Sequence, residues 1–415
     1  MLRLLGFVQW LYSSSTERAH FPSTRLQLSK MKKAAILFLV CIVIACHVIV
    51  GMLNPALKTA SNSQVNLLEH WATSSTKTIL IWNAYSRFEL KVFGEGGSTF
   101  RRHKCAFSDC YITDNKSHSA LEDFDAVIFN MPSLSIRKFP LNKRRRPEQR
   151  YIFFTQESAA YIAEDVQKFN HLFNWTMTYA TNSDIPYTYG QVDRLPTSPM
   201  FTETNVEVNY ASGKTKLVAW FISHCLTQSR REKYVSILRK HIDVDIYGGC
   251  YTLKCAMNHS SQTSQSHCYD MLERDYKFYL AFENSFCGGY VTEKFFDILQ
   301  RRIIPVVMGA ANYSALAPPH SFIDALQYSP QQLAAYLNLL ASDDGLYNEY
   351  FWWKPYFKVE SRYPIMESRA LCHLCQKLHQ DRNLSVYDNL RPLWSKDTQC
   401  RSPKFKGVYL FWGIL

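Results

Sequence analysis

One stretch of the sequence places polar and ionisable residues where a buried strand would end. The apolar run "YKFYLAF" (276–282) is followed at once by "ENS" (283–285). A helical pattern then begins near residues 290–292, and its first turn contains Glu293 and Lys294. The N–H groups of a helix start are unpaired and carry partial positive charge, so this turn would attract an anion. A lysine there is unfavourable for the helix itself, which favours an anion-binding role over the alternative, a surface turn held by a Glu–Lys pair.

The elements that would position these residues follow an alternating pattern. Short β-branched or aromatic runs alternate with helical segments in two blocks, which predicts two α/β domains with mostly parallel sheets. The predicted strands lie at 77–85, 125–131, 150–158, 216–224, 244–249, 276–284 and 302–309. In such sheets ligands bind beyond the carboxyl ends of the strands. Residues 283–285 should therefore face the ligand crevice.

Two helices are predicted with particular support from their sequence. The segment 231–242, "REKYVSILRKHI", follows the strand at 216–224. The segment 329–342 has Ser329 as its cap, Pro330 in the first turn and Gln332 where a capping box requires it.

An apolar segment near the start predicts a membrane anchor. Residues 34–53 contain no charged side chain and are long enough to cross a hydrocarbon core of roughly 30 Å. Three lysines between residues 30 and 33 precede it, so residues 1–33 should stay cytosolic and the rest should lie outside the cytosol. The alternative is a cleaved signal peptide, but the run is longer than a typical signal core of about 7–15 residues. Residues 54–76 are polar and are interpreted as a stem.

Cysteine usage and glycosylation motifs fit a lumenal location. Of 12 Cys, Cys41 and Cys46 lie in the predicted span, and the remainder would form disulfides in an oxidising compartment. A four-thiolate zinc site is the alternative for four of them, Cys105, Cys110, Cys372 and Cys375. Five candidate N-glycosylation sites lie on the same side, at Asn115, Asn174, Asn258, Asn312 and Asn383.

The basic composition does not require a nucleic-acid partner. The formal net charge is +12, and the first 33 residues contribute six Lys or Arg against one acid. The remaining positive charge suits an anionic ligand or a membrane surface. The run 142–150, "NKRRRPEQR", is interpreted as a solvated loop.

A possible metal motif is better explained as part of a strand. Asp243 and Asp245 spell D-x-D, but they lie in the strand-like run "IDVDIYG", where polar and apolar residues are expected to alternate. We therefore predict no metal site.

The motif "FYLAFENS…YVTEK" followed by "IIPVVMG" closely resembles the signature of the α-1,3/4-fucosyltransferases. The resemblance runs from about residue 77 to 395 and includes "LVAWFISHCLTQSRREKYVSILRKHIDVDIYGGC" and "YIFFTQESAAYI…FNWTMTYATNSDIPYTYG". It is closest to invertebrate and plant core-type members. It implies a single-pass type II Golgi membrane enzyme of the α/β GT-B fold, with two Rossmann-like domains facing a cleft after one transmembrane helix. The implied parts are an acceptor-side domain at 77–210, a GDP-fucose domain at 211–360 and a C-terminal segment at 361–415 that returns to the first domain.

The resemblance also implies roles for individual residues. Glu157 would be the general base that deprotonates the acceptor hydroxyl in an inverting displacement. Arg231, with Arg230 as a competing choice, and Lys294 would stabilise the leaving diphosphate. Glu293 would hold ribose or fucose hydroxyls. Further donor-binding candidates are Asn284, Ser285, Tyr290, Tyr187 and Tyr189. No metal or other cofactor would be required.

The implied activity is transfer of fucose from GDP-fucose to N-acetylglucosamine of glycoprotein glycans in α-1,3 linkage. The acceptor would be an N-glycan core or a Lewis-type outer arm, and a homodimer is left open. The alternative is a non-catalytic sugar-binding homologue, because Gly289 stands where the family usually has Asp. The resemblance also implies two disulfides among Cys105, Cys110, Cys372 and Cys375, with the other lumenal cysteines pairing in the donor half.

Overall fold

The computed structural model describes residues 76–84, 92–196, 208–255, 262–361 and 365–407. Within these ranges no helix combines the length and apolar character needed to cross a bilayer. The predicted span at 34–53 and all of the predicted stem except its last residue lie outside them, as does Asn258.

The first half of the described chain forms a six-stranded parallel sheet in the order β2-β1-β3-β4-β5-β6. Its strands are β1 (Lys77–Ile81), β2 (Cys110–Thr113), β3 (Ala126–Asn130), β4 (Arg150–Thr155), β5 (Trp175–Thr178) and β6 (Ile185–Pro186). The connections contain α4 (Ser98–Arg102), η1 (Leu121–Asp123), η2 (Met131–Ser133), η3 (Ile136–Lys138), η4 (Ala159–Tyr161) and η5 (Val166–Phe169).

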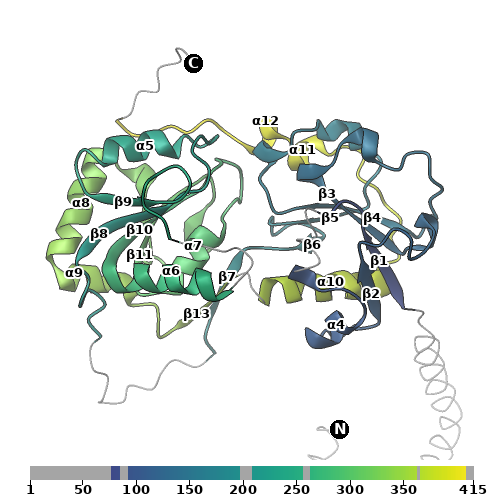
Figure 1. Ribbon diagram of the computed structural model, residues 1–415, viewed down its shortest axis with the longest axis horizontal. Helices are drawn as coiled ribbons and strands as arrows, with labels where there is room; N and C mark the ends of the chain where they lie inside the picture. The colour runs from purple at the N-terminus through teal and green to yellow at the C-terminus, as the bar shows by residue number, and fades with distance from the viewer. Residues whose placement is uncertain (1–75, 85–91, 197–207, 256–261, 362–364, 408–415) are drawn as a thin grey trace, which may run out of the picture. The chain divides into compact units, whose positions relative to one another are not determined.

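The second half forms a five-stranded parallel sheet in the order β12-β11-β10-β8-β9. Its strands are β8 (Lys216–Phe221), β9 (Val244–Tyr247), β10 (Tyr276–Phe282), β11 (Ile304–Met308) and β12 (Ile323–Asp324). Its helices are α5 (Arg231–Leu238), α6 (Gln262–Asp275), α7 (Glu293–Leu299), α8 (Pro330–Ser342) and α9 (Asp344–Asn348), with the 3₁₀ turns η6 (Tyr313–Ala315), η7 (Ala325–Gln327) and η8 (Glu349–Phe351). Figure 1 shows α5, α8 and α9 covering one face of this sheet and α6 and α7 the other.

Both sheets are covered on both faces, which explains their continuous apolar strands. In β10, Phe278, Leu280 and Phe282 face one hydrophobic cluster, while Tyr279 and Ala281 face another. This period of two is the strand geometry itself, because successive side chains point to opposite faces. The apolar runs predicted as strands therefore do form sheets, although each strand ends a few residues earlier than its run.

The predicted capping of the helix at 329–342 is confirmed. The Gln332 N–H donates to Ser329 Oγ at 3.2 Å, and the Ser329 N–H donates to Gln332 Oε1 at 3.1 Å. The helix begins at Pro330, as the first-turn preference of proline requires.

The chain then returns from the second sheet to the first and back again. An antiparallel ribbon joins β7 (Gly190–Arg194) to β13 (Phe357–Ser361). Helix α10 (Glu367–Gln380) packs on β1 and β6, and α11 (Arg391–Trp394) and α12 (Lys396–Gln399) pack near η5 and η4. After α12 the Arg401 N–H donates to Phe286 O at 2.9 Å, so the last described residues contact the second half. The C-terminal segment thus connects both halves rather than the first alone.

Candidate active site

The carboxyl ends of strands from both sheets open into one cavity of about 510 Å³. Glu157 reaches it from the end of β4, Asn284 from the end of β10, and Arg231 from the first residue of α5. Glu293 and Lys294 reach it from the start of α7. Predicted site residues that line the cavity are Glu157, Tyr189, Arg231, Asn284, Tyr290, Glu293 and Lys294. Five of these seven predicted residues belong to the second half, so this half supplies most of the predicted residues in the lining.

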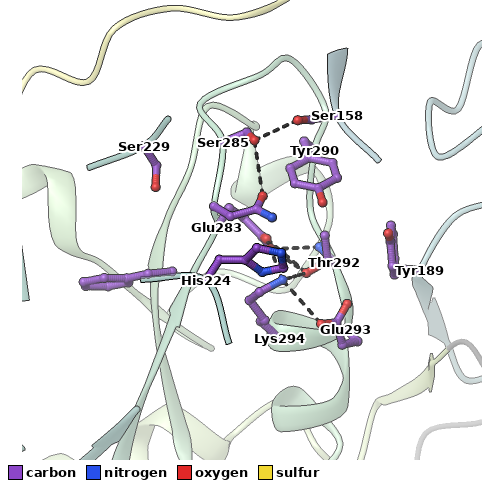
Figure 2. Close-up of polar contacts among 12 residues, drawn as sticks. Ser158, Tyr189, His224, Ser229, Glu283, Ser285, Tyr290, Thr292, Glu293 and Lys294 are labelled. Atoms are coloured by element: carbon purple, nitrogen blue, oxygen red, sulfur yellow. Dashed lines mark hydrogen bonds and ion pairs between the residues drawn. The ribbon is translucent and has the colours of Figure 1, made fainter. Parts of the chain in front are cut away.

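A buried carboxylate holds the lysine of this cavity in place. Glu283, which is fully buried, accepts hydrogen bonds from the Thr292 N–H at 2.8 Å and from Lys294 Nζ at 3.1 Å. Lys294 Nζ also donates to Thr292 Oγ1 at 2.6 Å and to Glu293 Oε1 at 3.3 Å. Figure 2 shows Lys294 among these three partners. The sequence pattern did not assign this positioning role to Glu283.

The protonation of this pair follows from its surroundings. Burial would lower the pKa of Lys294, but the carboxylates of Glu283 and Glu293 outweigh it and raise that pKa. Burial raises the pKa of Glu283, and the Lys294 ammonium and the Thr292 N–H oppose that shift. Lys294 therefore remains a cation when the site meets a ligand.

One backbone N–H at the start of α7 is already engaged within the protein. The Glu283 carboxylate already accepts the Thr292 N–H at the helix start. A negative group at this position also stabilises the helix dipole. The Lys294 side chain therefore adds a full positive charge beside a helix start whose N-cap N–H is already engaged by Glu283.

Arg231 is the second cation of the cavity and is almost completely buried, with 1% of its surface exposed. Its Nη1 donates to Phe282 O at 2.5 Å, and its guanidinium lies 5.5 Å from the centre of the Trp220 ring. Burial lowers its pKa, and the nearby Glu283 carboxylate opposes that shift. Its Nε is buried with no hydrogen-bond partner, which is costly unless a ligand supplies an acceptor. The competing candidate, Arg230, does not line the cavity and precedes α5 with a φ of 49°.

Glu157 faces these two cations from the first half. Its backbone N–H donates to Thr155 Oγ1 at 3.0 Å, which fixes the turn after β4. Its Oε2 accepts a hydrogen bond from the Tyr290 hydroxyl at 3.3 Å. Burial, with nearby Tyr189 and Glu157, raises the pKa of Tyr290 well above its ordinary value. Tyr290 is therefore a neutral donor that orients the carboxylate.

The remaining predicted residues divide into two groups. The Tyr189 hydroxyl donates to Gln156 O at 2.7 Å, and its ring stands edge-on to Tyr290 at 6.4 Å. Ser285 does not line the cavity, but Ser158 Oγ donates to its Oγ at 2.7 Å and links the two halves (Figure 2). Tyr187 lies in the core cluster of the first sheet, with its hydroxyl donating to Glu367 at 3.2 Å, and does not face the cavity.

The structure adds residues that sequence reasoning did not select. Lys254 lines the cavity, and its Nζ donates to Gly248 O and Tyr251 O, both at 2.7 Å. The same wall contains the aromatic side chains of Phe221, Tyr247, Tyr269 and Tyr279, together with Ser223 and His224. Gly248 has a φ of 131°, and a Cβ there would lie 1.8 Å from Ile222 O. Gly248 directly follows β9 in the sequence, and a glycine at that position was the sequence signal that could have indicated this part of the cavity.

Gly289, where the resembling family usually has Asp, is exposed and does not line the cavity. Its φ is 66°, a left-handed conformation that glycine adopts without cost. No neighbour lies within 4 Å of a Cβ placed there, so the cavity contacts described above do not depend on a side chain at this position.

The D-x-D pair lies away from the cavity. Asp245 Oδ2 accepts from Tyr276 Oη at 2.5 Å and from Lys216 Nζ at 3.0 Å, while Asp243 is exposed before β9. This agrees with the interpretation of the motif as part of a strand.

Ten cysteines in the described ranges form five disulfide bonds. The first half is joined to α10 by Cys105–Cys372 and Cys110–Cys375. His379 lies near Cys110 and Cys375, but these two sulfurs are bonded to each other and offer no thiolate for zinc. The other pairs are Cys225–Cys250, Cys255–Cys268 and Cys287–Cys400.

The described candidate glycosylation sites differ in accessibility. Asn115, Asn312 and Asn383 are exposed. Asn174 is only 5% exposed, its Oδ1 accepts the Tyr151 N–H, and its Nδ2 donates to Ser385 O at 2.9 Å. Its amide nitrogen is therefore not free to carry a glycan, and this predicted site is corrected.

Two parallel α/β sheets open their carboxyl edges into one cavity, where a carboxylate from one half faces cations from the other. This is the architecture of a two-domain glycosyltransferase. Residues 74–190 match the family model described as fucosyltransferase, N-terminal, and residues 211–393 match that of glycosyltransferase family 10 (fucosyltransferase) C-term. The chain belongs to glycosyltransferase family 10, the fucosyltransferases.

Curated relatives agree with this family. Alpha-(1,3)-fucosyltransferase C of Drosophila melanogaster is 36% identical over 351 residues, covering 79% of this chain and 80% of that protein. Glycoprotein 3-alpha-L-fucosyltransferase A of the same organism is 35% identical over 348 residues, covering 82% of this chain and 65% of that protein. A solved α1,3-fucosyltransferase structure aligns with 16% identity and a TM-score of 0.49, over 75% of this chain and 92% of that one.

Proposed function

We propose that this chain transfers fucose from GDP-fucose to N-acetylglucosamine of glycoprotein glycans in α-1,3 linkage, with inversion at the anomeric carbon. Family membership supports fucosyl transfer, and relatives carry names that specify the α-1,3 linkage and a glycoprotein acceptor. The observation that carries the proposal is the single cavity in which Glu157 faces Arg231 and Lys294.

The reaction needs one base and a stabilised leaving group. Glu157 takes the proton of the acceptor hydroxyl as that oxygen bonds to the anomeric carbon of fucose. The bond between this carbon and the diphosphate oxygen breaks on the opposite face. A positioned base contributes roughly 10²–10⁴-fold to such a step. Tyr290, which donates to Glu157 at 3.3 Å, holds the carboxylate in its orientation.

The leaving GDP carries the developing negative charge. The guanidinium of Arg231 can donate several hydrogen bonds to phosphate oxygens, and its Nε has no hydrogen-bond partner within the protein. The ammonium of Lys294 is held in place by its hydrogen bond to Glu283. Lys254 is a third cation on the same wall. We place the guanine base against the aromatic side chains of that wall, since aromatic rings stack on flat heterocycles. Glu293 and Asn284 remain to bind sugar hydroxyls.

We infer a Golgi membrane location, with residues 34–53 as a type II anchor and the catalytic part in the lumen. The uncharged span, its lysine flank and the disulfide content support this placement. Glycosylation at the exposed sites Asn115, Asn312 and Asn383 would report on it, because N-glycans are added in the lumen.

The test is a transfer assay on the full-length chain in detergent micelles. GDP-fucose is offered with an N-glycan peptide that exposes N-acetylglucosamine, GDP release is measured, and the product linkage is read by NMR. We expect an α-1,3-fucosyl product and no consumption of GDP-mannose, which serves as the matched donor control. Activity should persist in EDTA, because two cations of the protein face the diphosphate. Measurable GDP binding without transfer to any acceptor would instead identify a non-catalytic sugar-binding protein.

A further inference from the structure

A second cavity is lined in part by the segment that follows Glu157. We call it the Trp394 cavity; it has a volume of about 400 Å³ and lies between the segment with η4 and η5 and the segment with α11 and α12. Ala159 lines it and follows Glu157 by only two residues. Ala163, on the same wall, is six residues from Glu157, so at most roughly 20 Å of extended chain separates them. The cavity is therefore formed in part by the segment that follows Glu157 directly in the chain.

The chemistry of the lining fits a neutral polyhydroxylated ligand. The polar and charged members are Glu164, Asp165, Gln167, Arg391, Ser395, Lys396 and Asp397. Carboxylates only accept hydrogen bonds, whereas guanidinium and ammonium groups only donate. Sugar hydroxyls do both, so they can pair with each kind of group. An anionic ligand would be opposed by three carboxylates, and an acyl chain would cover charged groups without replacing the water that their remaining hydrogen-bonding sites contact.

The lining is held in shape before any ligand arrives. Arg391 Nε donates to Asp397 Oδ2 at 3.1 Å, and Lys168 Nζ donates to Glu164 Oε1 at 2.5 Å. Asp165 Oδ1 accepts the Gln167 N–H at 3.0 Å. Each group uses only part of its hydrogen-bonding capacity in these contacts. Binding would therefore cost little ordering of side chains.

Trp394 lines this cavity and packs against aromatic side chains that lead to the catalytic one. It is 6% exposed, and its Nε1 is buried without a hydrogen-bond partner. Its ring lies 5.0 Å from Tyr179, which lies 4.9 Å from Tyr290 beside Glu157. The family model of the second half ends at residue 393, so Trp394, Ser395, Lys396 and Asp397 of the lining lie beyond it.

We propose that the Trp394 cavity is a carbohydrate subsite that binds the part of the acceptor glycan beyond the reacting N-acetylglucosamine. This proposal rests on the proposed function, because it assumes that the acceptor is a glycan. The subsite makes the enzyme distinguish extended glycans from short ones, while the catalytic cavity holds the donor and the reacting N-acetylglucosamine.

The test compares acceptors of increasing size on a variant in which the cavity is filled. Ala163 is exposed and lines the cavity, so Ala163→Trp fills it without replacing a core side chain. Ala315, in η6, is exposed and outside the lining, so Ala315→Trp is the matched control. The acceptors are the methyl glycoside of N-acetylglucosamine, a free N-glycan, and the same glycan on a short peptide.

We expect Ala163→Trp to lower kcat/KM on both extended acceptors about tenfold relative to the methyl glycoside, with GDP affinity and melting temperature as in Ala315→Trp. An equal change on all three acceptors, or no change, would overturn the proposal. A loss confined to the glycopeptide would also overturn it, because it would assign the cavity to peptide. If the wild-type chain used no acceptor at all, the proposed function itself would fail, which is a different result.

Discussion

The two carboxylates that contact Lys294 should have different effects when each is replaced by a neutral amide: one replacement should lower stability, and the other should lower fucosyl transfer. Glu283 is fully buried and accepts three donors: the Thr292 N–H at 2.8 Å, Thr292 Oγ1 at 3.0 Å and Lys294 Nζ at 3.1 Å. Glu293 keeps 23% of its side chain exposed and contacts Lys294 at 3.3 Å. Glu283→Gln and Glu293→Gln are therefore a matched pair that remove the same charge on either side of one lysine.

The expected magnitudes follow from burial. A glutamine at 283 can still accept from Thr292, but its amide NH₂ must meet a second donor, and the buried ammonium loses its counter-charge. Breaking a buried ion pair in this way costs about 3–5 kcal/mol, which lowers the melting temperature by roughly 10 °C. The longer, partly exposed contact of Glu293 is worth less, on the order of 1 kcal/mol. Glu293→Gln should instead lose fucosyl transfer, because Glu293 lines the donor cavity.

The assay is thermal melting at a fixed scan rate, together with GDP-fucose turnover well below the melting temperature. The fixed rate matters because large disulfide-bonded proteins often unfold irreversibly. We expect a stability loss confined to Glu283→Gln and a transfer loss in Glu293→Gln at nearly wild-type stability. The reasoning would be refuted if Glu283→Gln melted with the wild type, or if Glu293→Gln were the less stable of the two.

Three further predictions follow from other parts of the structure. Glu157→Gln should reduce kcat by roughly 10²–10⁴ while leaving GDP affinity unchanged, because it removes the base and keeps an acceptor for Tyr290; near-normal turnover would remove Glu157 as base. The bridges Cys105–Cys372 and Cys110–Cys375 close loops of nearly equal sequence separation, 267 and 265. Replacing either pair by alanine should therefore lower the free energy of unfolding far less than replacing both, for which loop entropy gives about 5–6 kcal/mol. Additive losses of stability in melting experiments would contradict this. Burial lowers the pKa of Lys354 to about 8 from 10.5, so between these pH values the folded state binds fewer protons than the unfolded state and stability rises with pH. The melting temperature of the wild type should therefore rise relative to that of Lys354→Met from pH 7.5 to 10. A difference that did not depend on pH would refute this.

Local patterns in the sequence were sufficient for the elements and for part of the site. The run at 276–282 could be predicted as a strand because it is short, nearly continuously apolar and rich in aromatic residues, which is typical of a strand buried on both faces. The capping box at Ser329 depends on residues three apart, so it could also be predicted. The family motif placed Glu157, Arg231, Glu293 and Lys294, all of which line one cavity.

Other site assignments failed because they depend on distant contacts. Asn174 matches a glycosylation motif, yet Ser385, more than two hundred residues away, accepts its amide hydrogen. Tyr187 and Tyr189 differ by two residues and look alike in sequence, but only Tyr189 lines the cavity. The strands were predicted too long at their carboxyl ends, because the residues that follow each strand directly were counted as part of the apolar run.

The sequence by itself determined the succession of strands and helices, the cap of α8 and the membership of the family, because each is written in residues close together in the chain. The tertiary structure alone decided that Glu283 holds Lys294, which cysteines pair, and that Ser158 contacts Ser285. These contacts join residues brought together only when two sheets fold against each other, and no local pattern encodes which buried charge will find which partner.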